Sequence, residues 1–268
     1  MLYLERRPVG VLAPLVRMFW LAQDAGARSR PGCQRVLPNG CMQIIVSVSG
    51  RSLTDLSDGV RVATSAELMV GVQRRFQTIA TEDLEDLVGV VFQPGGFRPL
   101  FGRPADEFCD LEVPLAFVPV HWVDLLRSQL REVRGPARRL DVLERMLAER
   151  LRRTDAKRCA LTGFALAELS RGTAVAEIAR QSGYSTRWLG EAFRREVGVS
   201  PKVYDRILRF QRAVRMMHDG KAMGLAELAL DCGFYDQAHF VHEFQMFSGM
   251  CPTSYQKAHR PWSNHIAD

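Results

Sequence analysis

The chain has 268 residues, of which 47% are hydrophobic and 25% charged, a composition that excludes disordered and fibrous proteins. Its net charge of +6 only weakly favours a polyanionic partner. No segment approaches the roughly 18 consecutive apolar residues of a membrane-spanning helix, and the six cysteines form no C-x-x-C pair. We therefore expect a cytoplasmic protein with reduced thiols, no membrane contact, no metal and no cofactor.

The first hundred residues have the pattern of short β-strands. The segments "CMQIIVSVSG", "AELMVGV", "RRFQTIAT" and "DLVGVVFQPGG" are rich in β-branched residues and are bounded by Gly, Pro or charged residues. Strands at this spacing favour an antiparallel sandwich or barrel. The last of them ends in "FQPGGF", where a glycine can adopt the positive φ of a turn.

Helical spacing begins after Pro104, in "HWVDLLRSQLREV" and "RRLDVLERMLAERLRR". In the second segment Leu140, Leu143 and Leu147 share one face. This segment offers only about two heptads, fewer than a coiled coil needs, so we expect it to pack against its own domain. The last ten residues, "HRPWSNHIAD", are expected to be a frayed polar tail.

One helical unit occurs twice in the C-terminal part. In the first copy, "VAEIARQSGYSTRWLGEAFRREVGVSP", Ile178 belongs to the apolar face of a short helix and Gly183 permits a sharp turn. Ser185 can then cap a second helix, whose inner face includes Phe193. This pattern predicts a helix-turn-helix unit over about 174–198.

The second copy, "LAELALDCGFYDQAHFVHEFQMFSGMCP", has the same logic over about 224–249. Gly233 occupies the turn, Asp236 can cap the next helix, and Phe240 and Phe244 form its inner face. Both copies continue as G-x-x-P-x-x-Y, with a proline that suits the start of a helix.

A helix is predicted over 201–218, between the two copies. About 17 helical residues span roughly 25 Å, which can hold two outward-facing helices about one turn of DNA apart. The two copies therefore suit two successive major-groove segments on one side of a duplex.

These residues resemble the DNA-binding domain of the AraC/XylS family of bacterial transcription regulators. The resemblance rests on "EIARQSGYSTRWLGEAFRREVGVSPKVY", "RFQRAV" and "ELALDCGFYDQAHFVHEFQMFSGMCPTSY". It implies a seven-helix domain whose third and sixth helices contact bases in the major groove. Cys251 departs from the usual Ser before Pro252, and Gly190 weakens the first of these helices by about 1 kcal/mol relative to Ala.

The resemblance also implies a division into two domains. Residues 1–152 would form an effector-sensing and dimerisation domain, with a cupin-like β-barrel or sandwich, and 153–260 would form the DNA-binding domain. The complete chain is thus of the α+β class. The segments "LPNGCMQIIVSVSG" and "GVVFQPGGFRPLFG" resemble an uncharacterised N-terminal domain found on some of these regulators. Neither resemblance names an effector.

Helical geometry selects the side chains that would face base edges. If Leu189 and Phe193 point inward, the opposite face of the first recognition helix points to DNA, where Arg187 could bond guanine and Glu191 could accept from cytosine. In the second helix the same argument applies opposite Phe240 and Phe244. The predicted base-facing set is Arg187, Trp188, Gly190, Glu191, Arg194, Gln237, Ala238, His239, His242 and Gln245.

Other residues are assigned to phosphates, which position a protein without specifying sequence. The spacer arginines 206, 209, 212 and 215 are expected to serve in the same way. The predicted phosphate contacts are Ser185, Arg195, Lys202 and Asp236. For each charged residue, the alternative is a solvated helix face.

Catalysis is the competing interpretation. A cupin-type metalloenzyme needs a histidine cluster, but His121 is the only histidine before His218. A DNA-repair protein with a thiolate zinc cluster would need more cysteines at closer spacing than Cys33, Cys41 and Cys109. His239 and His242 could ligate a metal at i, i+3, but they lie on the predicted DNA face. We expect no enzyme.

The expected partners follow from the regulator interpretation. They are double-stranded DNA, a small-molecule effector of unknown identity, RNA polymerase if the protein is an activator, and a second copy of the chain. Gln73, Arg74 and Arg75 lie at a strand boundary, where they could meet an anionic effector or form an exposed basic hairpin. The sequence leaves activation and repression both open.

Overall fold

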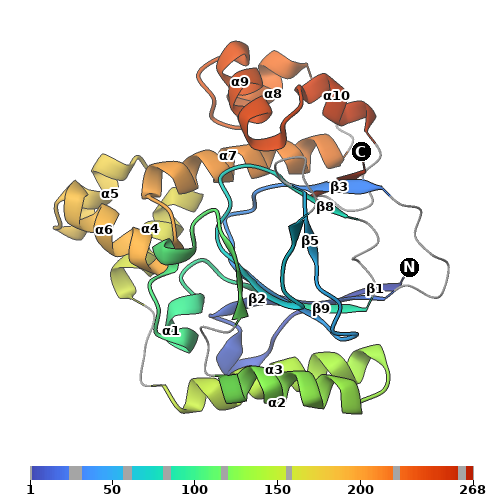
Figure 1. Cartoon of the computed structure of the whole chain (residues 1–268). Coiled ribbons are helices and arrows are strands. Elements are labelled where there is room, and N and C mark those ends of the chain that lie inside the picture. The colour runs from blue at the N-terminus through green and yellow to red at the C-terminus, as the bar shows by residue number, and fades with distance from the viewer. Residues whose placement is uncertain are drawn as a thin grey trace.

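The computed structural model describes residues 2–23, 32–56, 62–80, 86–115, 120–154, 159–219, 224–258 and 264–267. Residues 2–154, which we call the two-sheet part, form flanking helices and two β-sheets, and residues 265–267 add one more strand to the smaller sheet (Figure 1). Residues 159–258 are helical and form the helical part. This arrangement is the α+β class that the sequence predicts.

The larger sheet contains six antiparallel strands in the order β1-β2-β9-β4-β7-β10. Its central strand β9 has the sequence LVGVVF and is buried along its whole length. An uninterrupted apolar strand of this kind suits a position covered on both faces. The strands are β1 (Leu2–Arg6), β2 (Val16–Gln23), β4 (Gln43–Ser47), β7 (Glu67–Val70), β9 (Leu87–Phe92) and β10 (Glu112–Pro114).

The smaller sheet has the order β11-β3-β8-β5-β6 and is also antiparallel. No strand pairing joins the two sheets within the described ranges, so the fold is an open sandwich and not a closed barrel. The strands are β3 (Cys33–Val36), β5 (Thr54–Asp55), β6 (Val62–Ala63), β8 (Gln77–Ala80) and β11 (His265–Ala267).

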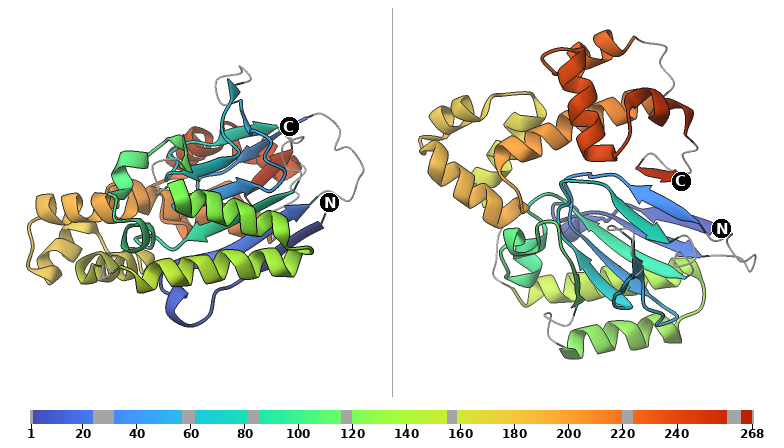
Figure 2. Two further views of the ribbon diagram at one scale, coloured as in Figure 1. Left: turned by 60° about the horizontal axis from the view of Figure 1, so that its bottom comes forward. Right: turned by 45° about the horizontal axis from the view of Figure 1, so that its top comes forward.

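Helices cover the outer face of the larger sheet (Figures 1 and 2). Helix α3 packs on β2 and β9, and it buries Leu140, Leu143 and Leu147 there. Its apolar face is therefore used within its own domain, as predicted. The remaining elements of this layer are η1 (Gly10–Leu12), α1 (Phe97–Phe101), η3 (Ala105–Phe108) and α2 (Val120–Glu132), with α3 at Pro136–Arg152.

Seven helices, α4 to α10, follow in the described residues of the helical part. The bounds of the repeated unit and of the spacer agree with the sequence prediction to within a few residues. No helix among the described residues combines the length and apolar character required to span a bilayer. The helices are α4 (Ala160–Ser170), α5 (Val175–Ser182), α6 (Thr186–Val197), α7 (Pro201–His218), α8 (Leu225–Asp231), α9 (Gln237–Ser248) and α10 (Pro252–Lys257).

The C-terminal tail corrects one prediction. Its residues 265–267 form β11, which pairs with β3 at the edge of the smaller sheet (Figure 2). Ile266 is fully buried there. The expectation of a frayed tail was wrong for these residues because their strand partners lie about 230 positions away, where local polarity gives no signal.

Candidate nucleic-acid interface

Helices α5 and α6 form the first helix-turn-helix unit. Gly183 has φ of +74° in the turn, a conformation that costs glycine little because it has no Cβ. Ser185 then caps α6 by accepting a hydrogen bond from the Trp188 backbone N–H at 3.2 Å. Leu189 and Phe193 are fully buried. The opposite face of α6 is therefore directed outward.

The outward face of α6 is charged and aromatic. The Arg187 side chain is 89% exposed and bonds Glu191 one turn away, with Nε to Oε1 at 3.0 Å. Trp188 stacks on Tyr184, with ring centroids 4.6 Å apart. An exposed i, i+4 ion pair is weak, so the Arg187 guanidinium is available to a stronger acceptor.

Helices α8 and α9 form the second unit on the same plan. Asp236 caps α9 by accepting from the His239 backbone N–H at 2.7 Å. The inner face contains Phe240 and Phe244, which are fully buried. His239 is held at the helix start, where its Nδ1 accepts from the Tyr235 N–H at 3.2 Å. Its imidazole is therefore directed back toward the turn.

The residues assigned to base contacts lie at the surface of the two units, as do Ser185, Arg195 and Asp236, whereas Lys202 lies at the start of α7. Two aromatic residues in the turns were not assigned: Tyr235 is 86% exposed and Tyr184 is 48% exposed. Tyr184 directly follows the turn glycine of the first copy and Tyr235 lies two residues after that of the second, and this was the available signal. Exposed are Arg187, Trp188, Glu191, Arg194, Gln237, Ala238, His242, Gln245, Ser185, Arg195, Lys202 and Asp236, whereas Gly190 and His239 are half-buried.

The spacer α7 has 18 residues, so it is about 27 Å long, and the two units lie along it (Figure 1). Three of its arginines form hydrogen bonds within the protein. Arg209 donates to the Gly233 carbonyl at 3.2 Å and Arg212 to the Cys232 carbonyl at 3.3 Å. Arg206 forms two bonds with Glu243, at 2.6 and 2.8 Å. These contacts hold the second unit on α7, and the expected phosphate contacts of these arginines stay a prediction.

Burial and pairing oppose one another at Glu243, which is 6% exposed. Burial alone would raise the pKa of this carboxyl, but the hydrogen bonds and charge of Arg206 outweigh it and lower the pKa. The carboxylate therefore stays ionised as half of an ion pair between α9 and α7.

Comparison with known families identifies the helical part. A family model described as "Helix-turn-helix domain" matches residues 178–258, and one described as "Domain of unknown function (DUF6597)" matches residues 4–114. Residues 178–258 form an AraC-type helix-turn-helix domain. The protein is accordingly a DNA-binding transcription regulator. No curated protein matches the chain.

Several solved structures are similar to this chain. A probable AraC family transcriptional regulator from Rhodopseudomonas palustris is 26% identical, with 36% of this chain and 91% of that chain covered and a TM-score of 0.32. ToxT from Vibrio cholerae is 13% identical, with 85% and 96% covered and a TM-score of 0.43. A transcriptional dual regulator from Escherichia coli is 24% identical, with 36% and 86% covered and a TM-score of 0.31.

The AraC-type domain contacts the two-sheet part through the closing glycine of each unit. A Cβ at Gly198 would lie 3.3 Å from Val72 Cγ2, and a Cβ at Gly249 would lie 2.3 Å from the Phe76 ring. Arg35 also donates to the Gly249 carbonyl at 3.3 Å. Val72 and Phe76 belong to the same connection, between β7 and β8. One loop therefore touches both units.

An ion pair also connects α6 to the two-sheet part. Glu196 lies on the inner face of α6, where its side chain is 3% exposed, and it pairs with Arg98 of α1. The Arg98 side chain is 41% exposed. Because the buried carboxylate has its charged partner in the other part of the chain, α6 depends on α1 for electrostatic compensation.

A cavity of about 760 Å³ lies between the two sheets. Its apolar surface includes Met18, Trp20, Ile45 and Ile79. Gly89 lies opposite Trp20 on the neighbouring strand, and a Cβ there would lie 2.3 Å from the indole. Glycine at this position thus lets the indole lie against the sheet.

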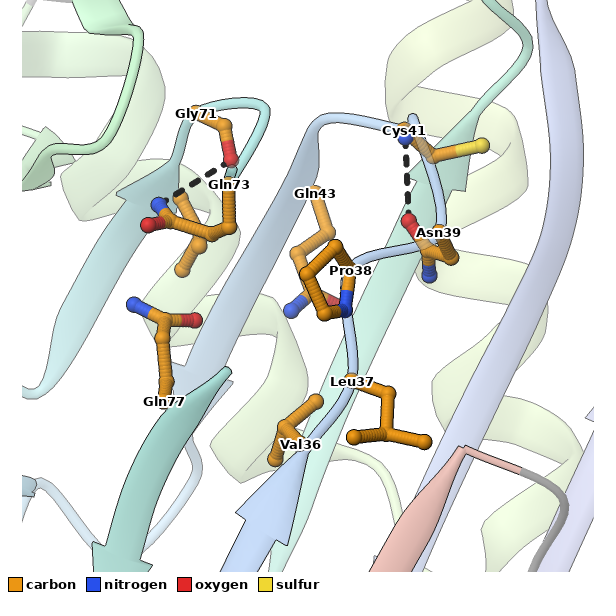
Figure 3. A pocket seen from close by; sticks show the side chains of 10 residues that line it. Val36, Leu37, Pro38, Asn39, Cys41, Gln43, Gly71, Gln73 and Gln77 are labelled. Atoms are coloured by element: carbon orange, nitrogen blue, oxygen red, sulfur yellow. Dashed lines mark hydrogen bonds between the residues drawn. The ribbon is translucent and has the colours of Figure 1, made fainter. Parts of the chain in front are cut away.

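A smaller pocket adjoins this cavity, and the amides of Asn39, Gln43 and Gln77 line both (Figure 3). Gln43 and Gln77 project there from the two sheets, and Asn39 lies on the loop between β3 and β4. The ionisable side chains along the cavity are Glu5, Arg7, Arg17, Glu112 and His265. Burial lowers the pKa of His265 to about 4, so its imidazole is neutral at pH 7.

The described residues were also compared with the spacing of metal ligands. No group of three or more His, Cys, Asp or Glu side chains with metal-ligand spacing occurs in the part of the chain that the structure describes. His239 already uses Nδ1 to accept a backbone hydrogen bond. The side chains on the outward faces of α6 and α9 are suited to hydrogen bonding and stacking.

Proposed function

We propose that this regulator contacts two successive major-groove segments through α6 and α9 and responds to a small molecule bound between its sheets. The single observation that carries the DNA model is the pair of capped helices with buried inner faces, presented outward along one 18-residue spacer. Arg187 and Glu191 are proposed to select bases in one segment, and His242 and Gln245 in the other.

The proposed effector site is the cavity between the sheets. Its volume of about 760 Å³ lies in the range of small-molecule sites in proteins. Two carboxylates, Glu5 and Glu112, balance two guanidinium groups, Arg7 and Arg17, and the other polar side chains include several amides. A charged ligand would find no net countercharge in this partly desolvated space. We therefore propose an uncharged molecule with an apolar body that packs on Trp20.

The remaining elements of the proposal follow from the regulator function. Residues 1–152 are proposed as the sensing and dimerisation domain and 153–260 as the DNA-binding domain. The proposed protein partners are a second copy of the chain and, for activation, RNA polymerase. We propose no catalytic activity.

Selection from a random duplex pool, followed by footprinting, tests the DNA model. The expected footprint has two protected patches whose centres lie about one helical turn, or 10.5 base pairs, apart. A single short patch would contradict the contribution of two helices. Binding to all duplexes with equal affinity would contradict base selection by either helix.

Matched alcohol and acid probes test the effector model. Decan-1-ol and decanoate share one apolar chain and differ in head-group charge at pH 7. We expect decan-1-ol to raise the melting temperature increasingly as its concentration exceeds its dissociation constant, and decanoate to leave it unchanged. A shift with decanoate alone would reverse the assignment of charge. Gly89→Val should abolish the shift, because its side chain displaces the Trp20 indole into the cavity.

A further inference from the structure

The C-terminal strand β11 supplies part of the cavity wall. It follows the AraC-type domain in sequence, yet it returns to the two-sheet part and pairs with β3 (Figure 2). The Leu37 N–H donates to the Asn264 carbonyl at 2.9 Å, extending this pairing by one residue. Ile266 is fully buried within the core. The tail is therefore an integral part of the smaller sheet.

Two tail side chains border the cavity itself. Asn264 and His265 both line it, and His265 Nδ1 lies 3.3 Å from Gln34 Oε1 on the adjacent strand. They offer a neutral imidazole and an amide, groups that can both donate to and accept from an uncharged ligand. A molecule in the cavity would thus meet residues that come from beyond the DNA-binding domain.

The spacer helix is bonded to the same tail. Gln211 lies at the middle of α7 and is 7% exposed. Its Nε2 donates to Asn264 Oδ1 at 3.0 Å and to the Pro38 carbonyl at 2.6 Å. Pro38 lines the smaller pocket that adjoins the cavity, and the next residue, Asn39, lines both (Figure 3). One buried amide therefore connects α7 to Asn264, which lines the cavity, and to the residue before Asn39.

We propose that β11 is a ligand-contacting wall of the effector site and that Asn264 transmits occupancy to the spacer helix through Gln211. This inference rests on the proposed effector function. A ligand that accepts from the Asn264 amide group holds the opposite oxygen toward Gln211. Because a buried amide is costly to leave unpaired, the two contacts on Asn264 strengthen together. Ligand binding thereby fixes α7, and with it the two recognition helices, against the two-sheet part.

Hydrogen exchange tests the contact between Gln211 and the C-terminal tail without DNA or ligand. Gln211→Leu keeps the size of the side chain and removes both donated bonds. We expect the Leu37 amide and the amides of 265–267 to exchange about tenfold faster, the factor that corresponds to one lost buried hydrogen bond. Gln129→Leu, on α2, is the control and should leave these amides unchanged. Unchanged exchange in Gln211→Leu would overturn the inference.

A double-variant cycle tests the transmission to DNA. Removal of residues 262–268 and Gln211→Leu should each change affinity for the selected duplex at least about fivefold, and combining them should add nothing further. Additive effects, or an unchanged affinity in both single variants, would overturn the inference that Asn264 acts on α7 through Gln211. Circular dichroism checks that each variant is folded, and the point substitution still decides if the truncated protein is not.

An experiment with added ligand distinguishes a failure of this inference from a failure of the proposed function. If the full chain binds decan-1-ol, the duplex affinity should shift on its addition, and Asn264→Leu should remove that shift. Retention of the full shift in Asn264→Leu would overturn the inference while leaving the effector site intact. If neither probe binds the full chain, the proposed effector class is wrong, and the exchange experiment still decides whether Gln211 holds the tail.

Discussion

The two helix-turn-helix units share a backbone plan but compensate a buried charge in different ways. Glu196 of the first unit pairs with Arg98 from the two-sheet part, whereas Glu243 of the second pairs with Arg206 from the spacer. The second unit is therefore completed by its own spacer, and the first is completed by the other part of the chain. A change in the two-sheet part should reach the first unit more directly.

The exposed faces of the units also differ. Helix α6 carries three arginines, at 187, 194 and 195, and α9 carries none. The outward side of α9 presents the amides of Gln237 and Gln245 and the imidazole of His242 instead. Residues that shape the turn and the inner face are thus repeated, while residues that face solvent have diverged. This divergence suits two different base sequences.

The largest expected effect is from Arg206→Ala, which leaves Glu243 buried without its charged partner. We expect a loss of about 3 kcal/mol in the free energy of unfolding, measured by denaturant titration. Arg98→Ala should cost about 2 kcal/mol, because the side chain of Arg98 is 41% exposed and partly screened.

Hydrogen exchange locates these two losses. Arg206→Ala should increase exchange in α8 and α9, and Arg98→Ala in α1 and α6. Adding Glu243→Gln to the first variant should recover stability because it removes the uncompensated charge. Faster exchange in the same unit for both substitutions would contradict the different compensation of Glu196 and Glu243.

Arg187→Ala tests the charged face of α6. We expect a loss of about 1–3 kcal/mol in DNA-binding free energy, confined to one base position. Gln245→Ala on α9 should cost less because it removes only a neutral contact. Binding measured against single-base variants of the selected duplex checks both expectations.

Lys202→Ala is the control for Arg187→Ala. An exposed lysine at the start of α7 should contribute to phosphate binding, so its loss should weaken all duplexes alike and reduce the salt dependence. If both substitutions alter base preference to the same extent, the assignment of faces is wrong.

Gly249→Ala and Gly183→Ala separate backbone strain from contact between the two parts. Their φ values are nearly equal, +72° and +74°, so each substitution should cost about 1 kcal/mol from strain. Only the alanine at 249 meets the Phe76 ring, whereas nothing lies within 4 Å at 183. We expect about 1 kcal/mol more destabilisation at 249 from this overpacking. Phe76→Ala should remove that excess, and an equal cost at both sites would contradict the contact.

Much of the helical part could be predicted because its signals are local. Gly183, Ser185 and Phe193 lie within a few turns of one another, and the second copy repeats their spacing. The tail could not be predicted, because Gln34 and His265 meet across 231 positions. Periodicity identified the spacer arginines as neighbours, but which of them would face the second unit depends on how that unit packs. The cavity likewise exists only once two sheets face each other.

The smallest expected effect on stability concerns the helix that follows each unit. Ser200 caps α7 by accepting from the Val203 N–H at 3.4 Å, and Cys251 occupies the equivalent place before α10. Hydrogen bonds from Ser254 and Thr253 lower the pKa of Cys251 to about 7, whereas burial raises the pKa of Cys41 and Cys232. At pH 7 a larger fraction of Cys251 than of Cys41 or Cys232 is therefore the reactive thiolate.

Alkylation followed by peptide mass spectrometry compares the reaction rate of Cys251 with those of Cys41 and Cys232. Among these three cysteines Cys251 should react first with iodoacetamide, at a rate that rises between pH 6 and 8 and then levels as the thiolate fraction saturates. Cys251→Ser restores the residue of the first copy and should change stability by less than about 0.5 kcal/mol. A rate that still climbs about threefold from pH 8 to 9 would show an ordinary thiol with a pKa of about 8.5. The two copies would then differ in side-chain identity at this position and not in chemistry.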